Sequence, residues 1–576
     1  MKRYIYLLGI FLILVPGACE KMLDREAQLS LTSDLANTLY TYTQNKAYAL
    51  YTTLPSGFLQ INGAMMASAV DEAEHTLETS NIQKFNTGAW NAVDNPDNAW
   101  NTYFIGIRRA NIFLETADNT DLDRYKLDPN PARQAEYQTR KANIKSWKYE
   151  ARFLRAFFYF ELVKRYGGVP IITESLALTD DFKSIQRSSL EECIRFITDE
   201  CDSAAANLVV TYPTAELGRA TKGAALALKS RVLLYAASDL WNTPGWASGY
   251  SDPDMISLPT GDRIARWQAA ANAAKAMIDL PSTGYGIWTD YVTLFKSFQR
   301  NEQILVRRAA STNSFEIANY PIGYYQGNSG TTPSQNLVDD YEVKVNATTA
   351  VPFDWNNAAH AADPFANRDP RLAGTVLLNN RTFKGRPVEA FVGGLDGPGT
   401  TLASKTGHYL YKYIDPDLNL LTGQTSVHSW VLIRLGEVYL NYAEALNEAQ
   451  PGHADIKIYV DRVRTRTGVG MPPVPAGLTQ AQMREVIRHE RRVELAFEDH
   501  RAWDVRRWML GETYFNVPLR GLEITKTSDN PATFSYRVIN VEDRVFEPKM
   551  YFYPIPQTEL NIATGWIQNP GWATGL

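Results

Sequence analysis

The chain has 576 residues, of which 45% are hydrophobic and 21% are charged, as is typical of a globular protein with a large core. Its formal net charge is −5, and no basic tract argues for nucleic-acid binding, so nucleic acid is excluded as an expected partner.

A signal peptide is predicted over residues 1–18. It opens with two basic residues, continues with an apolar run over residues 4–15, and ends in Gly17 and Ala18 immediately before Cys19. The apolar run is shorter than the roughly 20 residues that span a membrane, which favours a cleaved signal. A cysteine directly after such a site resembles a bacterial lipobox, in which the thiol is acylated. We expect Cys19 to be lipidated; the alternative is an ordinary secretion signal with a cysteine nearby.

Helical periodicity dominates the chain after a short polar stretch. Residues 19–30 are predicted to be a tether between the acyl group and the folded body. Residues 147–166 then carry apolar side chains at a spacing of three or four, and Gly167 and Gly168 end the pattern. This helix is also aromatic on its flank, so we expect it at the centre of a large body.

Further helices are predicted in neighbouring pairs joined by short breaks. Residues 432–439 fit the Leu-x-x-Leu-Gly-x-x-Tyr start of a tetratricopeptide unit, in which the glycine allows close approach of the partner helix. Several pairs together favour a helical scaffold. These helices are expected over residues 190–208, 221–240, 264–278, 431–449, 454–467 and 480–497.

The two remaining cysteines are expected to be free thiols. Cys193 and Cys201 lie eight residues apart within the predicted helix 190–208. Eight helical residues rise about 12 Å, which exceeds the roughly 7 Å limit for a disulfide between Cα atoms. The sequence also contains no Cys/His cluster with zinc spacing, so we expect no metal and no cofactor.

Four long stretches lack periodicity and are rich in Asn, Gly, Ser, Thr, Pro and aromatic residues. Segments of this length in a compact protein are usually functional loops. They are residues 82–99, 241–262, 310–335 and 385–400.

The sequence contains no complete catalytic motif. His489-Glu490 lacks the second histidine that a metalloprotease helix needs. Asp339, Asp340 and Glu342 could form the acid/base pair of a glycosidase, but adjacent acidic residues on a surface are far commoner than catalytic pairs. We expect a protein that is not an enzyme.

Residues 487–508 carry many charges of both signs. One interpretation is a site for an anionic ligand. The favoured one is an ion-pair lattice between helices, because balanced charges three and four residues apart pair readily while the apolar residues pack inward.

The loops offer the side chains that a sugar site needs. Sugars present apolar C–H faces and many hydroxyl groups, so they are bound by flat aromatic rings beside amides and carboxylates. Most tyrosines and tryptophans lie in cores, and each one here is more often structural than ligand-binding. The candidate ligand-binding residues are Asp71, Trp90, Asn91, Tyr324, Tyr325 and Asn328.

Several segments in order along the chain resemble the SusD/RagB family of nutrient-uptake outer-membrane lipoproteins. They cover nearly the whole length. The segments are CEKMLD at 19–24, EARFLRAFFYFELVKRYGGVP at 150–170, PSQNLVDDYE at 333–342, RDPRL at 368–372, RLGEVYLNYAEALNE at 434–448, ERRVELAFEDHRAWDVRRW at 490–508, and the ending at 554–561 and 568–572.

The resemblance implies an all-α body of tetratricopeptide-like helical pairs with long loops and minor β-strands. It implies two regions, 31–220 and 221–576, that pack as one body. It also implies a lipid anchor in the outer membrane with the protein facing the cell exterior, and a SusC-like TonB-dependent transporter as partner. The matching motifs belong to the helical scaffold, so the resemblance does not imply a particular ligand.

We therefore expect a binding protein that captures oligosaccharide or polysaccharide outside the cell and passes it to the transporter. One alternative is a peptide or protein receptor of RagB type, which predicts an apolar groove in place of an aromatic platform. A second alternative is a surface glycosidase.

Overall fold

The computed structural model describes residues 33–177, 179–281, 284–298, 301–563 and 565–573. The predicted signal peptide, the tether and Cys19 lie outside the described residues.

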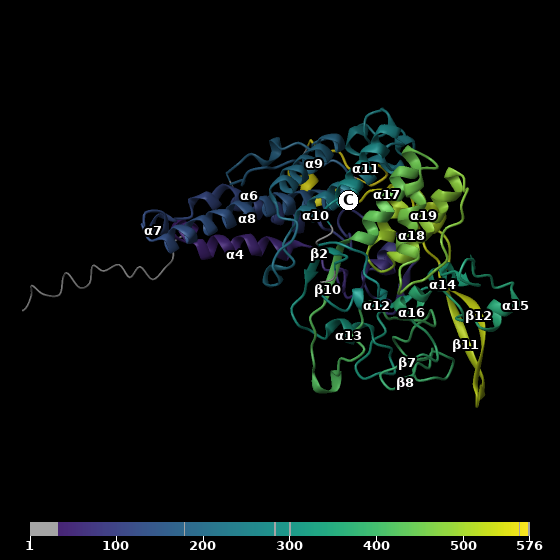
Figure 1. The fold of residues 1–576 in the computed structure, drawn as a ribbon. Helices are drawn as coiled ribbons and strands as arrows, with labels where there is room; N and C mark the ends of the chain where they lie inside the picture. Colours follow the sequence, from purple (N-terminus) through teal and green to yellow (C-terminus); the bar gives the residue numbers. More distant parts are fainter. Residues whose placement is uncertain (1–32, 178, 282–283, 299–300, 564, 574–576) are drawn as a thin grey trace, which may run out of the picture.

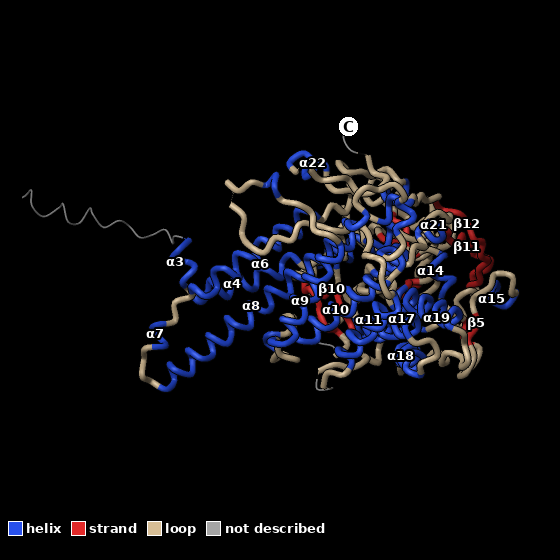
Figure 2. The backbone as a smooth tube through the Cα atoms, turned by 90° about the horizontal axis from the view of Figure 1, so that it is seen from above, coloured by secondary structure: helices blue, strands red, loops and turns tan. Residues whose placement is uncertain are grey.

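An arm of helices projects from the body of the molecule (Figure 1). It is built from α4 (Tyr40–Leu50), α6 (Trp100–Thr116), α7 (Asp123–Lys126) and the first half of α8 (Pro131–Tyr166). Figure 2 shows that α3 (Ser33–Thr38) lies beside this arm and that α7 lies at its end. The arm thus carries the first described residues of the chain.

Helix α8 joins the arm to the body. Asn130 caps its start by accepting a hydrogen bond from the backbone N–H of Ala132 at 2.9 Å, and Pro131 fits the first helical turn. Gly167, at φ 73°, ends the helix. From Ala151 to Tyr166 almost every side chain is buried, which confirms the predicted central position of residues 147–166.

The body is a stack of antiparallel helical pairs. Helix α10 packs against α9 and α11, α11 packs against α17, and α17 packs against α18 and α19. The predicted helical scaffold with long loops and minor strands is confirmed. The bounds are α9 (Leu190–Asn207), α10 (Lys222–Ala237), α11 (Arg263–Ile278), α17 (Leu435–Ala449), α18 (Ala454–Arg464) and α19 (Gln480–Glu494).

The prediction of helix over residues 431–434 is wrong. Strand β10 (Ser429–Arg434) occupies these positions and pairs antiparallel with β2 (Gln303–Arg308). Its residues are all buried and include the β-branched Val431 and Ile433, which suit a covered strand. Helix α17 begins only at Leu435.

Helix α19 ends three residues before the predicted limit. Phe497 at φ 60° and Asp499 at φ 62° adopt the left-handed backbone conformation, which a continuing helix cannot contain. The chain therefore turns sharply between α19 and α20 (His500–Arg507).

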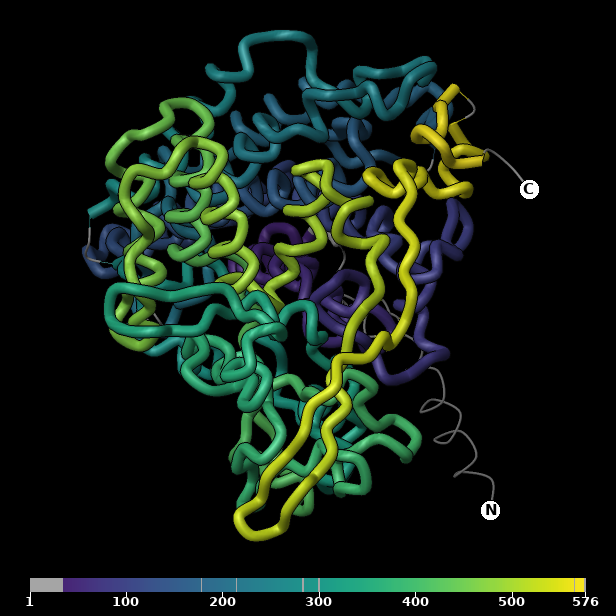
Figure 3. The backbone as a smooth tube through the Cα atoms, turned by 90° about the vertical axis from the view of Figure 1, so that its right-hand side faces the viewer, coloured from purple at the N-terminus to yellow at the C-terminus, as the bar shows by residue number. Residues whose placement is uncertain are grey.

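The described strands form six two-stranded antiparallel sheets at the edge of the helical stack. The longest pair, β11 (Leu519–Asp529) and β12 (Ala532–Glu542), is a hairpin that projects from the body beside the loops of residues 320–430 (Figure 3). The short strands are β1 (Ala73–His75), β3 (Thr331–Pro333), β4 (Val343–Lys344), β5 (Ala350–Val351), β6 (Val376–Leu377), β7 (Thr382–Phe383), β8 (Arg386–Pro387) and β9 (Tyr409–Leu410).

The predicted loops contain short elements. Residues 82–99 include α5 (Gln83–Thr87), and residues 310–335 include α13 (Ser314–Asn319) and β3. The other short helices are α12 (Tyr291–Leu294), α14 (Gln335–Asp340), α15 (Ala358–Ala362), α16 (Pro370–Thr375), α21 (Gly511–Tyr514) and α22 (Gln557–Ile562).

Both cysteines of α9 are free and buried, as predicted. Burial raises the pKa of the Cys193 thiol to about 12 and raises that of Cys201 as well, so neither is a reactive thiolate. Among the described helices, none combines the length and apolarity needed to cross a membrane.

Candidate functional site

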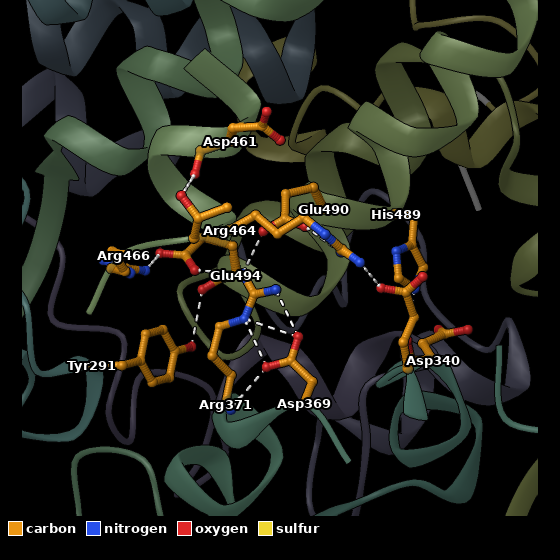
Figure 4. Close-up of polar contacts among 12 residues, drawn as sticks. Tyr291, Asp340, Asp369, Arg371, Asp461, Arg464, Arg466, His489, Glu490 and Glu494 are labelled. Carbon is orange, nitrogen blue, oxygen red and sulfur yellow. Dashed lines mark hydrogen bonds and ion pairs between the residues drawn. The ribbon is translucent and has the colours of Figure 1, made fainter. Parts of the chain in front are cut away.

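The densely charged segment 487–508 lies at the centre of a buried ion-pair cluster (Figure 4). Helix α19 presents Glu490 and Glu494 one turn apart on one face. Arg371, at the start of α16, donates from Nη1 to both carboxylates, at 2.8 Å to Glu494, and from Nη2 to Asp369 at 2.7 Å. These four side chains are at most 1% exposed. The cluster therefore clamps α16 onto α19.

Glu494 receives two further cations on its other oxygen. Arg434 donates to Glu494 Oε1 at 2.7 Å, and Arg466 donates to the same atom. Burial alone would raise the pKa of Glu494, but the charges of Arg466 and Arg434 hold it far below its usual value. The preferred interpretation of 487–508 as an ion-pair lattice is confirmed, although most partners come from distant segments and not from the same helix.

Asp71 belongs to the same kind of structure and not to an open sugar site. Its carboxylate accepts hydrogen bonds from Arg501 Nε at 2.9 Å and Nη2 at 2.8 Å, and from Arg492 Nη1 at 3.1 Å. Burial would raise the pKa of Asp71, but the charges of Arg492 and Arg501 lower it. Both oxygens are used within the protein, so the structure corrects the expectation that Asp71 meets ligand hydroxyls.

The acidic residues 339–342 form no free catalytic pair. Asp340 pairs with Arg492 Nε at 3.0 Å, and Glu342 pairs with Arg464. Asp339 accepts a hydrogen bond from Gln335 Nε2 at 2.7 Å. Each carboxylate thus has a partner within the protein, as is typical of acidic residues with a structural role.

Trp90 is a core residue in this structure. Its side chain is 3% exposed and lies against the rings of Phe85, Tyr553 and Trp572, at centroid distances of 4.9, 5.1 and 4.6 Å. Both faces of the indole are covered, so we correct its expected role as an open stacking platform. The exposed Asn91 caps the following turn, where its Oδ1 accepts a hydrogen bond from the backbone N–H of Val93 at 2.8 Å.

The neighbouring residues Tyr324 and Tyr325 have different environments. Tyr324 is 9% exposed and donates its hydroxyl hydrogen bond to the carbonyl of Phe383 at 3.1 Å. The guanidinium of Arg386 lies 3.7 Å from the Tyr324 ring centroid and forms a bidentate pair with Asp396. Tyr325 is 54% exposed. Of the two rings, only that of Tyr325 offers a face to a ligand.

Strand pairing brings a second loop to the segment that contains Asn328. The antiparallel pair of β1 and β3 places Thr76, where that loop begins, beside residues 328–330. The backbone N–H of Thr76 donates to the carbonyl of Gly330 at 2.9 Å, and the Thr76 hydroxyl donates to the carbonyl of Asn328 at 3.2 Å. The side chain of Asn328 is exposed beside this junction.

A third segment completes the surface. Lys405 Nζ donates to Glu78 Oε1 at 2.7 Å, which ties residue 405 to the loop 76–81. The backbone carbonyl of Leu395, whose side chain is 60% exposed, lies beside Gly323. We call the surface formed by residues 76–81, 320–330, 395 and 405 the loop face. It combines one aromatic ring with exposed amides and an ion pair.

Glu78, Lys405 and Leu395 could not be identified from the sequence, because they lie in separate segments and match no motif. The pairing of β1 with β3 joins only the segment of Glu78 to residues 328–330. Of the candidate residues, Tyr325 and Asn328 are exposed on the loop face, whereas Trp90 and Asp71 are buried elsewhere.

Asp499 forms a separate buried polar site. It lines a cavity of about 40 Å³ together with Lys164, Trp503 and other residues, and its Oδ1 has no hydrogen-bond partner. Burial raises the pKa of Asp499 to about 8. The carboxyl is therefore largely protonated at neutral pH.

An apolar groove of about 510 Å³ lies between α6, residues 170–185 and α22. Its walls include Trp100, Phe104 and Trp566. Within the described ranges, no group of three or more His, Cys, Asp or Glu side chains is placed to hold a metal ion.

Comparison with known proteins gives two family models. Residues 294–572 match a model described as the SusD family, and residues 22–234 match one described as starch-binding and associating with the outer membrane. SusD-like protein P2 of Formosa agariphila is 26% identical over 390 residues, which cover 65% of this chain and 67% of that protein.

Solved structures have the same fold. A SusD-like protein of Bacteroides fragilis is 26% identical, with a TM-score of 0.75 and coverage of 94% of this chain and 99% of that one. A laminarin-binding SusD-like protein is 22% identical, with a TM-score of 0.62 and coverage of 92% and 99%, a likeness that concerns the fold alone.

Proposed function

This chain belongs to the SusD/RagB family, and we propose on that basis that it captures oligosaccharides at the cell surface and delivers them to a SusC-like TonB-dependent transporter. The protein acts as a binding receptor and not as an enzyme. Its division into regions 31–220 and 221–576, packed as one body, belongs to the same proposal.

The observation that carries the proposal is the exposed ring of Tyr325 on the loop face. We expect a sugar ring stacked on Tyr325 to form hydrogen bonds with exposed polar groups of the loop face. One ring and a few exposed polar groups bind modestly, and such binding suits a receptor that must release its ligand to a transporter.

The proposed anchor is an acyl group on Cys19. It holds the receptor in the outer membrane with its body facing the cell exterior. Anchoring also keeps the receptor close to its transporter, because two partners confined to one membrane meet at high effective concentration.

The experiment that tests this function is retention of purified protein on a panel of glycans, with product release recorded in the same assay. We expect retention of at least one glycan without turnover. We expect Tyr325→Ala to abolish most of that retention and Tyr137→Ala, a half-buried tyrosine of the arm, to leave it unchanged. Product release would instead support a hydrolase.

The peptide-receptor alternative is favoured by one observation, the apolar groove lined by Trp100, Phe104 and Trp566. A receptor of that kind would bind apolar peptides there. A peptide panel on the same protein distinguishes the two functions, since peptide binding would be lost in Trp566→Ala and kept in Tyr325→Ala.

A further inference from the structure

The outer end of the arm contains a basic groove. The groove has a volume of about 580 Å³ and lies between the end of α6, the segment that contains α7, and the first half of α8. We call it the arm groove. Its basic lining residues are Lys126, Lys141, Lys145, Lys148 and Arg152.

Four of these cations lie on one face of α8. Positions 141, 145, 148 and 152 are spaced by four, three and four residues, which brings them into one row on the helix. Like charges at such spacings repel one another and weaken an isolated helix. The row therefore has an electrostatic cost that a bound anion would relieve.

Only part of this charge is neutralised within the protein. Lys148 pairs with Asp118, and Arg152 pairs with Glu200 at 2.6 Å. In the part of the chain that the structure describes, the exposed ammonium groups of Lys126 and Lys141 make no hydrogen bond or ion pair, and Lys145 lies only near the Tyr149 ring, at 6.0 Å. Three cations thus remain available to bind an anion, although the net charge of the protein is −5.

The groove lies beside the point where the chain enters the described structure. The backbone N–H of Asp121 donates to the carbonyl of Thr38 in α3 at 2.8 Å, and the hydroxyls of Thr43 and Thr120 are 2.7 Å apart. Thr120 lines the groove. The 14 residues that lead back from Ser33 to Cys19 can span at most about 50 Å.

An exposed apolar residue accompanies the cations. Leu127, next to Lys126 at the end of α7, is 74% exposed, and Tyr137 and Tyr149 line the groove. Cations beside apolar and tyrosine side chains are the combination found where proteins meet the headgroup region of a membrane.

We propose that the arm groove binds the phosphate groups of anionic lipid headgroups in the leaflet that holds the acylated Cys19. This inference rests on the lipid anchor of the proposed function, since the anchor brings the arm to the membrane. A basic patch on the arm would add electrostatic attraction to anionic lipid to the hold of the anchor. Binding by the arm would also restrict how the body stands on the membrane.

The test uses the mature chain, residues 19–576, with Cys19→Ser, so that only the protein surface meets the lipid. Its partition onto vesicles of phosphatidylcholine mixed with phosphatidylglycerol is compared with that onto phosphatidylcholine alone, by co-sedimentation at low salt. Each cation near the membrane raises the partition coefficient of the protein onto anionic vesicles by roughly a factor of five. We expect the triple variant Lys126→Gln, Lys141→Gln, Lys145→Gln to lose roughly 100-fold in partition onto the anionic vesicles.

The matched control carries the same charge change elsewhere, as Lys183→Gln, Lys296→Gln and Lys526→Gln, and should partition as the parent protein does. An equal loss in the control would overturn the proposal, because the effect would then follow net charge. Inorganic phosphate bound as tightly as the vesicles would also overturn it, since the site would then serve a soluble anion.

Two further measurements separate this inference from the proposed function. Palmitate labelling of the unmodified chain tests Cys19, and glycan retention tests the loop face. If labelling fails but the vesicle preference persists, the anchor is wrong and the groove stands. If labelling and glycan retention succeed but the triple variant partitions normally, the groove alone is wrong.

Discussion

Replacing Glu494 with glutamine tests whether the buried ion-pair cluster holds the scaffold together. The substitution keeps the shape of the side chain and removes one negative charge. Arg371, Arg434 and Arg466 all donate to Glu494, so the variant leaves three buried guanidinium groups short of countercharge.

The structure sets the size of the effect. Removing one partner from a buried ion pair costs about 3–5 kcal/mol. At roughly 2.1 cal/mol/K per residue, the 576-residue chain has an unfolding entropy of about 1.2 kcal/mol/K, so the melting temperature should fall by about 3–4 °C.

The assay is thermal unfolding of Glu494→Gln beside Glu485→Gln at several pH values. Glu485 lies on the same helix with its side chain 60% exposed and pairs with Arg488, so its loss should cost less than about 1 kcal/mol. The lowered pKa of Glu494 means that its contribution is present above pH 4.5 and declines as the pH falls further. Equal melting temperatures for the two variants at pH 7 would refute the reasoning.

Three further substitutions follow from the same structure. Trp90→Ala should lower the free energy of unfolding, measured by urea titration, by about 3–5 kcal/mol, and the folded variant should keep glycan retention. Lost retention at unchanged stability would show that Trp90 contacts the ligand. In the parent protein, the Asp499 carboxyl has a raised folded-state pKa of about 8, so the protein loses stability as the pH rises from 4 to 8. Asp499→Asn should therefore gain about 1.4 kcal/mol of stability over the parent protein for each pH unit in this range. A difference in stability that does not depend on pH would contradict this. Burial would raise the pKa of Glu444, but the charge of Arg507 lowers it to about 2. Glu444→Gln should therefore destabilise the protein above pH 4.5 and progressively less between pH 4.5 and 2, which acid unfolding curves would measure.

Local patterns predicted much of the helical scaffold. The apolar period and paired glycines of residues 147–166 indicated a central helix, and this segment is buried in α8. The first half of α8 was missed because residues 131–146 are polar on most sides and present no apolar stripe. Its capping residues, Asn130 and Pro131, were the available signal.

Residues 431–434 show where periodicity fails. A short apolar run of β-branched residues fits a buried strand and a buried helix equally well. The pairing of β10 with β2, more than a hundred residues earlier in the chain, decides between them, and no local pattern contains that information.

The candidate site was only partly predictable for the same reason. Residue type correctly pointed to aromatic loops but could not separate Tyr325, which is exposed, from Tyr324, which packs under Arg386. Nor could it show that Asp71 is held by two arginines more than four hundred residues away. Burial and long-range pairing are properties of the folded chain.

The central claim is that the loop face binds sugar through Tyr325, and the most direct measurement is the dissociation constant of a retained oligosaccharide for the parent protein and for Tyr325→Ala. A tyrosine side chain with about 100 Å² of exposed apolar surface contributes up to about 2.5 kcal/mol when a sugar covers it. We predict affinity lower by roughly 10- to 70-fold with the melting temperature unchanged. Unchanged affinity in Tyr325→Ala would contradict the account.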